Sequence, residues 1–428
     1  MASFLYVTTI VVGALFALLY PPLKHTATVM GLFRPLHSWQ NLHGMENHFI
    51  DGTIACEDLH YHEHSAMLYS ACAGNAEKAA GWFPGAGSLD HPENPPYGTL
   101  VVINPKTLTS QKLSLTNFEG PFVTHGISIY SPPSDLETVY IYAVNHLPNP
   151  LWTPSSPEQP KAASRIELFV HTVGSNTAEH LRSISHPLIR TPNDLLALSE
   201  HEFLVTNDHY YRDGFMRLVE EMSYLSWTDV VHVRLDDAAN ASASVSLNSI
   251  PTNNGLGWGP NQQVLISNPV GGDLYFSRLE GGYNKTLSVT HSIRADGVVD
   301  NPSFFSDPWA GLDGKDYSGY LLPGIGRPID LATNYKDPAG KAPLASIVWY
   351  LPVAAGEKEG ASEATKPTLL FADDGSSLRG ATTAVIVGID PATNEGKREG
   401  WLFVTGVIAP HMIATKIDFA TALSSGVE

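Results

Sequence analysis

The chain has 428 residues, with 25 lysines and arginines against 43 aspartates and glutamates, so its formal charge is −18 with histidine neutral. Such an acidic chain lacks the basic surface that neutralises phosphates, which argues against nucleic acid as a partner. Only 16% of the residues are charged, 43% are hydrophobic, and 36 glycines and 31 prolines punctuate the sequence. This composition favours short strands joined by tight turns and argues against disorder.

The N-terminus begins with an uncharged apolar run, FLYVTTIVVGALFALLY, at residues 4–20. We expect residues 1–22 to be a signal peptide or a membrane anchor, followed by a linker at residues 23–45. Few small residues stand at the usual cleavage spacing, which favours a retained anchor and membrane association through residues 4–20. The simpler alternative is a buried core helix.

Two further features indicate the secretory pathway, and hence a membrane-anchored or extracellular protein. Asn240 and Asn284 begin Asn-x-Ser/Thr sequons for glycosylation. Cys56 and Cys72 lie symmetrically about His64 in a stretch that resembles a hairpin, and a three-residue loop centred there would set them opposite each other. We expect them to form a disulfide in an oxidising compartment, the alternative being two buried thiols.

Strand-like runs recur along the rest of the chain, and each ends in Gly, Pro, Asn or Asp. They lie at residues 99–103, 138–144, 165–171, 202–206, 229–234, 263–267, 273–278, 346–351, 368–371, 383–388 and 401–404. A long all-β chain of many short strands suits a propeller or a large barrel. No blade motif repeats at a fixed period, so the pattern leaves the number of blades open.

One helix is expected among the strands. Residues 215–227 place Phe215, Leu218, Met222 and Leu225 on one face, as in an amphipathic helix. The proline-rich residues 148–160 and the Gly/Glu/Ala-rich residues 355–366 are expected to be surface insertions.

The commonest catalytic motifs are absent from the sequence. It holds no Gly-x-Ser-x-Gly elbow, phosphate loop or His-Glu-x-x-His, which argues against the common serine hydrolases, nucleotide enzymes and zinc proteases. His60, His62 and His64 alternate along one predicted strand and share a face, as zinc ligands do. Surface imidazoles on a hairpin are the simpler interpretation.

Acid and amide doublets stand at the ends of predicted strands. They are Glu57-Asp58, Asn193-Asp194, Asn207-Asp208 and Asp300-Asn301, with Asn253-Asn254-Gly255 alongside. Adjacent residues on an extended backbone point opposite ways, so two doublets brought together offer oxygen ligands to two separate points. Calcium takes about six to eight such oxygens, so the pattern suits two stacked calcium sites. The alternative is ordinary turn chemistry, in which Asn and Asp bond the local backbone.

These residues, taken in order, resemble a known family, the serum paraoxonase and arylesterase enzymes. The matching segments are CEDLHYHE from Cys56, FPGAGSLDHPENPPYG from Phe83, THGISIY with His125, YAVNH ending at His146, TPNDLLAL, VTNDHYYRDG, NNGLGWGPN and VVDNPSF. The resemblance covers most of residues 40–420. It implies an all-β, six-bladed β-propeller over residues 46–428, with a central tunnel holding two calcium ions, preceded by the N-terminal hydrophobic helix.

The resemblance also implies a role for each matching residue. The ligands of a catalytic calcium would be Glu57, Asn193, Asn254, Asp300 and Asn301. The ligands of a structural calcium would be Asp58, Asp194 and the backbone carbonyl of Ile127. One histidine of the pair His125 and His146 would activate a water that the other supports, with Asp208 and His209 orienting these groups. Glu57 is a second candidate for the general base.

The expected function is therefore calcium-dependent hydrolysis of lactones and aryl esters, in which calcium polarises the carbonyl and a base activates water. A gluconolactonase-like sugar-lactone hydrolase and a strictosidine-synthase-like propeller are alternatives with the same fold. Another alternative is a catalytically silent propeller that keeps calcium for stability and binds a partner protein or lipid. The sequence leaves the natural substrate and the oligomeric state open.

Three departures from the family restrict these expectations. Neither end of the propeller carries the cysteine that closes it in animal members, so closure must rest on strand pairing. A family histidine has no clear counterpart near residues 319–327, GYLLPGIGR, and Thr252 stands where an aromatic pocket residue is expected. Specificity is therefore not implied, and phosphotriester hydrolysis, a side activity in the family, is left open.

Overall fold

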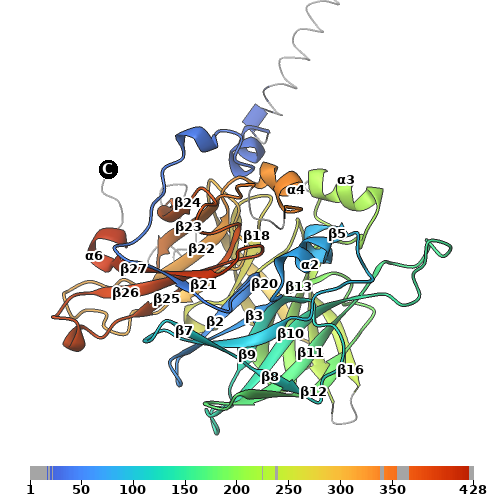
Figure 1. Ribbon diagram of the computed structural model, residues 1–428, viewed down its shortest axis with the longest axis horizontal. Helices are drawn as coiled ribbons and strands as arrows, with labels where there is room; N and C mark the ends of the chain where they lie inside the picture. Colours follow the sequence, from blue (N-terminus) through green and yellow to red (C-terminus); the bar gives the residue numbers. More distant parts are fainter. Residues whose placement is uncertain are drawn as a thin grey trace, which may run out of the picture.

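The computed structural model describes residues 17, 20, 21, 23–223, 225–236, 240–337, 342–353 and 366–423. The predicted anchor at residues 4–20 and the predicted insertion at residues 355–366 lie almost entirely outside these ranges. Within them, no helix has the length and apolar character needed to cross a membrane. The described chain is an all-β, propeller-like fold with few helices (Figure 1).

The strands form antiparallel sheets that follow one another along the chain. The largest sheet holds β1 Asn47–Ile50, β2 Cys56–His62, β3 Met67–Cys72, β6 Thr99–Asn104, β7 Thr109–Lys112, β25 Ala381–Gly388, β26 Glu399–Gly406 and β27 Met412–Asp418. The second holds β8 Ser114–Thr116, β9 Thr124–Tyr130, β10 Thr138–Pro148, β11 Ala162–Thr172 and β12 Thr177–Ile184, of which β8 pairs in parallel with β12.

Three four-stranded sheets follow in sequence. They are β13 Pro192–Ser199, β14 Glu202–Asn207, β15 Thr228–Leu235 and β16 Ala241–Ile250; β17 Leu256–Trp258, β18 Gln263–Asn268, β19 Asp273–Glu280 and β20 Thr286–Arg294; and β21 Ser303–Phe305, β22 Gly319–Ile325, β23 Ser346–Pro352 and β24 Thr368–Asp373. A two-stranded sheet joins β4 Trp82–Phe83 to β5 Ser88–Leu89. Every predicted strand run coincides with one of these strands, which confirms the all-β prediction.

The first strands of successive units meet around a closed ring. β2 contacts β9, β9 contacts β13, β13 contacts β17, β17 contacts β21, β21 contacts β25, and β25 returns to β2. The largest sheet spans the closure, because β25–β26–β27–β1 and β2–β3–β6–β7 are two antiparallel runs that meet at the single pair Cys56↔Gly406. β1 pairs with β27 from Asn47↔Thr415 to Ile50↔Met412, so strand pairing closes the ring, as predicted.

The hydrophobic core lies between neighbouring sheets. One cluster joins β10 and β11 to β13–β15 through side chains such as Tyr142, Phe203 and Val231. A second joins β22–β24 to β25–β27 through side chains such as Leu321, Phe371 and Leu402. Burial of apolar surface, at about 25 cal/mol per Å², is the main favourable term in such a fold. Packing between the sheets therefore stabilises the strands that carry the central residues.

The helices are short, and most lie at one end of the sheets. They are α2 Ala76–Gly81, α3 Phe215–Ser223, α4 Leu331–Asn334 and α6 Phe419–Ala422, with the 3₁₀ turns η1 Leu36–Ser38, η2 Pro84–Ala86, η3 Pro260–Gln262, η4 Pro328–Asp330 and η5 Pro391–Thr393. Helices α2, α3 and α4 gather at the top of the view in Figure 1, together with the N-terminal segment, in which residues 23–29 are helical.

The segment expected to be a linker, residues 23–45, packs on the sheets. Val29 is fully buried. The Arg34 guanidinium donates to the backbone carbonyl of Asp296 at 3.0 Å, and Leu42 forms an antiparallel bridge with Ala372. This part of the chain is therefore bound to the surface that carries the helices.

Helix α3, Phe215–Ser223, is shorter than the predicted residues 215–227. Its predicted apolar face points outward, with Phe215 76% and Leu218 49% exposed. The buried side chains are Arg217, which donates to a backbone carbonyl of the β4–β5 connection at 3.0 Å, and Glu220, which accepts backbone N–H groups from the preceding loop. Hydrogen bonds of charged groups, rather than the apolar stripe, hold this helix. The predicted insertion at residues 148–160 is a surface connection between β10 and β11.

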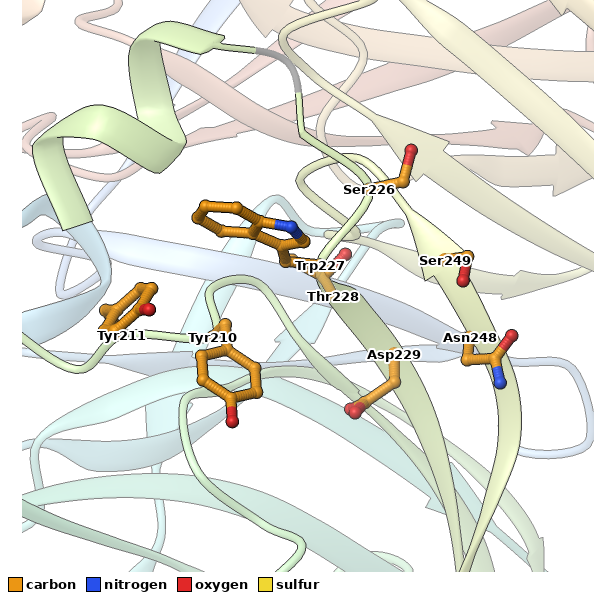
Figure 2. Close-up of a pocket in the computed structure, with 8 residues that line it drawn as sticks. All are labelled: Tyr210, Tyr211, Ser226, Trp227, Thr228, Asp229, Asn248 and Ser249. Atoms are coloured by element: carbon orange, nitrogen blue, oxygen red, sulfur yellow. The ribbon is translucent and has the colours of Figure 1, made fainter. Parts of the chain in front are cut away.

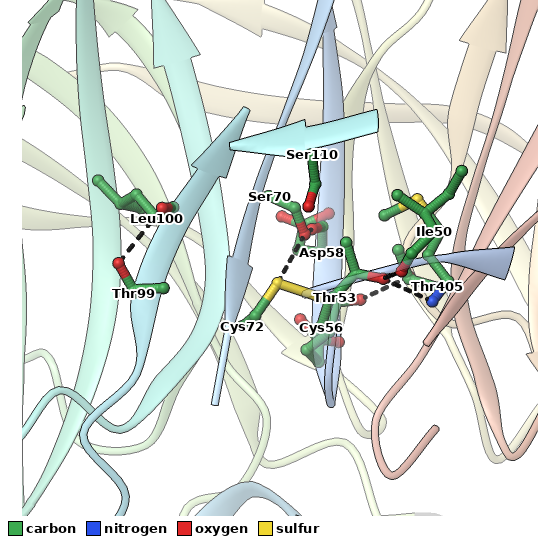
Figure 3. Close-up of a disulfide and its surroundings, with 12 residues drawn as sticks. Ile50, Thr53, Cys56, Asp58, Ser70, Cys72, Thr99, Leu100, Ser110 and Thr405 are labelled. Carbon is green, nitrogen blue, oxygen red and sulfur yellow. Dashed lines mark hydrogen bonds between the residues drawn. A yellow bond between two sulfur atoms is a disulfide. The ribbon is translucent and has the colours of Figure 1, made fainter. Parts of the chain in front are cut away.

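The predicted disulfide between Cys56 and Cys72 is confirmed (Figure 3). The hairpin differs in one detail, because the loop spans residues 63–66 and pairs His62 with Met67. A β-bulge at Glu57 absorbs the extra residue, so that Cys56 still lies opposite Cys72. The disulfide therefore fixes the strand on which the first acid doublet stands.

Candidate active site

β-Bulges occur at the start of four central strands, where two residues face one on the neighbouring strand. The doublets in these bulges are Glu57-Asp58 on β2, His125-Gly126 on β9, Asn193-Asp194 on β13 and Thr382-Thr383 on β25. A bulge interrupts the alternation of faces on which the prediction of two separate sites relied. Both members of each acid doublet are consequently buried near the ring's centre.

The other two central strands carry their doublets just before the strand begins. Asn254-Gly255 precedes β17, and Asp300-Asn301 precedes β21. A Cβ atom added to Gly255 would lie 2.7 Å from Asn301 Oδ1, and one added to Gly126 would lie 2.5 Å from Asp194 Oδ1. These glycines leave the space in which the polar groups meet.

Carboxylates from three doublets interact at the centre. Burial, followed by the charges of Asp300, Asp58 and Asp194, raises the pKa of Glu57 well above its ordinary value. Burial and the charge of Asp58 also raise the pKa of Asp194. Burial, with the charges of Asp58 and Asp208, raises the pKa of Asp300 to about 8. A cation among these groups would remove the repulsion and favour their ionised forms.

Four of the buried acceptor oxygens that have no hydrogen-bond donor within the described part of the chain belong to predicted calcium ligands. They are Glu57 Oε2, Asn193 Oδ1, Asn254 Oδ1 and Asn301 Oδ1. A buried polar atom normally has a partner, and a carboxylate or amide oxygen can only accept. These oxygens, together with the carboxylate of Asp300, are the donor set that a hard cation such as calcium takes. The residues therefore fit the ion that the sequence implied.

The predicted structural site has a different character, because its carboxylates already accept backbone N–H groups. Asp58 Oδ2 accepts from Ile127 N at 2.9 Å, and Asp194 Oδ2 accepts from Leu256 N at 2.6 Å. The structure thus places the predicted ligands Asp58 and Ile127 in contact, through the amide of Ile127. Burial alone would raise the pKa of Asp58, but His60 and the backbone N–H groups of Ile127 and Leu59 lower it.

No group of three or more His, Cys, Asp or Glu side chains in the described ranges is arranged to hold a metal ion. This disfavours zinc at the three alternating histidines, whose rings have other partners. His60 lies 2.9 Å from Asp58 Oδ2, His62 bonds Ser65 and Ser131, and His64 bonds Glu137. Any cation at the centre depends on amide oxygens as well as carboxylates.

The two predicted histidines lie together beside this acceptor cluster. His125 Nδ1 is 2.9 Å from His146 Nε2, and His146 Nδ1 is 2.8 Å from Ser164 Oγ. His125 Nε2 lies 4.0 Å from Glu57 Oε1. Burial lowers the pKa of His125 to about 4 and that of His146 well below its ordinary value, so both rings are neutral at pH 7. The chain of ring nitrogens can therefore relay a proton away from the centre.

Neighbouring groups fix the histidines in place. The ring of Phe83 packs edge-on against His125 with centroids 4.7 Å apart, and Trp82 Nε1 donates to the carbonyl of His146 at 2.8 Å. A Cβ atom at Gly85 would lie 2.4 Å from His125 Cε1. The β4–β5 hairpin thus covers the histidine pair.

Asp208 and His209 form a buried pair that contacts Asn193. Asn193 Nδ2 donates to Asp208 Oδ2 at 3.4 Å, and His209 Nδ1 is 2.9 Å from Asp208 Oδ1. Burial opposes ionisation of Asp208, yet His209, Arg217 and His125 hold its pKa well below the ordinary range. The Asp208 carboxylate therefore favours its ionised form, and it borders a small pocket together with His146.

Threonines that the sequence did not single out complete the ring. Thr382, Thr383 and Thr405 direct their hydroxyls at the backbone carbonyl of Glu57, at 2.5, 3.0 and 3.2 Å. Thr383 Oγ1 also lies 3.1 Å from Asp58 Oδ1. The available signal was position, because Thr383 begins the predicted strand at residues 383–388 and the acid doublets also stand at strand ends. Their hydroxyl groups, unlike carboxylates and amides, did not indicate a metal site in the sequence.

These features define a class of protein: a β-propeller-like fold with a buried, oxygen-rich centre beside a paired histidine. Comparison with known proteins agrees with this class. Residues 79–308, more than half of the chain, match the sequence model of the Arylesterase family. The chain belongs to the arylesterase family.

Curated relatives of known name match over most of the chain. Serum paraoxonase/arylesterase 2 of Bos taurus is 27% identical over 287 residues, which is 66% of this chain and 68% of that protein. The protein of the same name from Gallus gallus is 25% identical over 307 residues, or 71% of this chain and 75% of that protein. A solved structure of a protein of unknown function from Dyadobacter fermentans has a TM-score of 0.50 and 11% identity, covering 88% of this chain and 98% of that chain, a likeness of fold alone.

Proposed function

We propose that this protein is a calcium-dependent hydrolase of lactones and aryl esters. It would use a six-bladed propeller, counting the largest sheet as two blades, with two calcium ions in the central tunnel. Family membership supports a lactone or ester hydrolase, and the names of the relatives include both paraoxonase and arylesterase. The observation that carries the proposal is the set of unpartnered acceptor oxygens close to the histidine pair.

The catalytic calcium would be held by Glu57, Asn193, Asn254, Asp300 and Asn301. The structural calcium would be held by Asp58, Asp194 and the carbonyl of Ile127. When bound, calcium supplies a positive charge that polarises the substrate carbonyl and stabilises the oxyanion. With their two carboxylates, the residues of each site balance the charge of one ion.

The chain's own groups would handle the proton. His125 is neutral, and with its Nδ1–H directed at His146 Nε2 it can accept a proton from water at Nε2. His146 Nδ1 can then donate to Ser164 Oγ, which fixes the second ring. Asp208 stabilises a positive imidazole. Glu57 is the other candidate base, because burial and its carboxylate neighbours raise its pKa.

The test is hydrolysis of aliphatic lactones and phenyl acetate by the purified protein, by His125→Gln and by a matched control, His171→Gln. His171 is equally buried but bonds the carbonyl of Thr177. His125→Gln should lose at least about a hundredfold in kcat/KM, as expected for a general base, while His171→Gln stays within about threefold of the parent.

Chelation distinguishes the remaining interpretations. Activity should vanish with chelator and return with calcium. Full activity in His125→Gln would leave Glu57 as the base. A protein that calcium stabilises but that hydrolyses neither lactones, sugar lactones nor esters would be a silent binding propeller, and the histidine roles would be withdrawn.

We also propose that residues 46–428 form the hydrolase domain of a protein of the secretory pathway. Support comes from the disulfide, which is typical of oxidising compartments. Asn240 and Asn284 are exposed, as glycosylation requires. A retained anchor at residues 4–20 would keep the domain at a membrane.

A further inference from the structure

A cavity of about 420 Å³ opens at the rim of the β13–β16 sheet and has no part in the proposed reaction (Figure 2). It lies next to the candidate active site, because Arg190 contacts both regions. Arg190 borders a small pocket with His146 and Asp208, and its Nη2 donates at 2.6 Å to Asp229, which lines the larger cavity.

One wall of the cavity is aromatic. Tyr210, Tyr211 and Trp227 gather on the side nearer α3 in Figure 2. The Tyr211 ring lies edge-on to both others, with centroids 5.1 Å from Tyr210 and 5.9 Å from Trp227. Tyr210 is 51% and Trp227 37% exposed. Large aromatic side chains left in contact with water are typical of binding sites, where one face meets a ligand and the polar edge stays hydrated.

The remaining wall and the floor are polar. Asn248 and Ser249 are both exposed and stand across from the aromatic rings (Figure 2). In Figure 2, Asp229 lies between Tyr210 and Asn248. Ser249 has a φ of 60°, a conformation that is costly for a residue other than glycine. One carboxylate oxygen of Asp229 accepts a hydrogen bond from Arg190, and the other accepts one from Asn207. Each oxygen therefore keeps a second acceptor position for a ligand.

The charges select the class of ligand. Arg190 neutralises Asp229, so the cavity offers no net charge to an ion. The guanidinium of Arg190 also lies over the Tyr210 ring, 5.2 Å from its centroid, where a ligand cation would otherwise bind. What remains is an apolar face opposite short hydrogen-bonding groups, an arrangement suited to a ring that is hydrocarbon on its face and hydroxylated at its edge.

We propose that this cavity is a binding site for a neutral hydroxylated ring, the chemistry of a monosaccharide unit. The site lies on the same rim as the candidate active site but does not depend on its chemistry. Asn253 connects the two, because its side chain donates to the carbonyl of Asp229 at 2.9 Å and the next residue is the proposed ligand Asn254.

Saturation-transfer NMR on the whole protein tests the proposal, with the methyl glycosides of glucose, galactose and mannose as probes. At least one glycoside should bind with a Kd of about 1 mM, or about −4 kcal/mol, and receive saturation at its ring C–H protons. Trp227→Ala and Asn248→Ala should each weaken binding by about fivefold or more. Trp258→Ala is the matched control, because Trp258 is 39% exposed but lies on β17.

Several results would overturn the proposal. One is no binding of any glycoside at about 50 mM, well above the expected Kd. Another is glycoside binding that both cavity variants retain. A third is binding of phenol or tetramethylammonium in place of the glycosides, since these probes report an aromatic or a cationic ligand. His125→Gln should bind the glycoside as the parent does, so failure of the proposed hydrolase leaves this test intact.

Discussion

Removal of calcium should lower the melting temperature of this protein by about 5–10 °C. The reason is the centre of the ring, where the acceptor oxygens of Glu57, Asn193, Asn254 and Asn301 have no donor among the described residues. Without a cation, these atoms are desolvated without compensation, and the neighbouring carboxylates repel one another or bind protons. Calcium that binds only the folded chain removes both penalties.

The size of the shift follows from linkage. Calcium at about a thousand times its Kd stabilises the folded state by about 4 kcal/mol per site. Unfolding entropy is about 2 cal/mol/K per residue, which for 428 residues is close to 0.9 kcal/mol/K. One filled site therefore raises the melting temperature by about 5 °C, and two filled sites by about 10 °C.

The assay is thermal unfolding with chelator, with restored calcium and with magnesium, which demands a tighter octahedral site and should restore less. Glu57→Gln should lose about half of the calcium shift, and its calcium-free melting temperature should not fall, because the change relieves repulsion. Glu399→Gln is the matched control, a buried carboxylate bonded to Asn394 and Lys416 far along the chain. It should destabilise the fold but keep the full shift. The reasoning is refuted if chelator and calcium leave the parent's melting temperature unchanged.

Three further predictions concern the frame around this centre. Gly126→Ala puts a Cβ atom 2.5 Å from Asn193 O, so it should lower the free energy of unfolding in urea by about 3 kcal/mol and weaken calcium binding. The control Gly282→Ala, where a Cβ atom would meet no atom within 4 Å, should be neutral. Equal effects of the two changes would contradict the crowding argument. Cys56 and Cys72 are 16 residues apart, and replacing both by Ala should lower the free energy of unfolding by about 3 kcal/mol. A loss below about 1 kcal/mol would show that the disulfide does not stabilise the hairpin. Burial opposes ionisation of Asp373, yet His43 and three backbone N–H groups lower its pKa from 3.8; its stabilisation is therefore full above that value and lost as pH falls below it. Asp373→Asn should cost about 2 kcal/mol at pH 7, and a difference from the parent that does not shrink towards pH 3 would show that the charge is irrelevant.

Much of this protein could be predicted from local sequence. Apolar runs bounded by Gly, Pro, Asn and Asp predicted the strands correctly, because these signals act within a few residues. The cysteine spacing predicted the disulfide, although the actual hairpin needs a bulge at Glu57 to bring Cys56 opposite Cys72. The order of the motifs predicted the arylesterase family, which the match over residues 79–308 bears out. The roles of the ligand and histidine residues stay predictions.

The assembly of the centre was decided by the tertiary structure. Asn301 donates to Glu57 at 2.8 Å across 244 positions of sequence, and no pattern of propensity extends so far. Helix α3 illustrates the same limit, because the sequence predicted its apolar stripe, whereas the hydrogen bonds of Arg217 and Glu220 hold the helix with Phe215 and Leu218 exposed. Thr382 and Thr383 contact Glu57 only because the fold brings β25 beside β2. Local sequence specifies strands and turns. Closure of the ring specifies which distant side chains lie in one buried space, where the charge of one carboxylate raises the pKa of others.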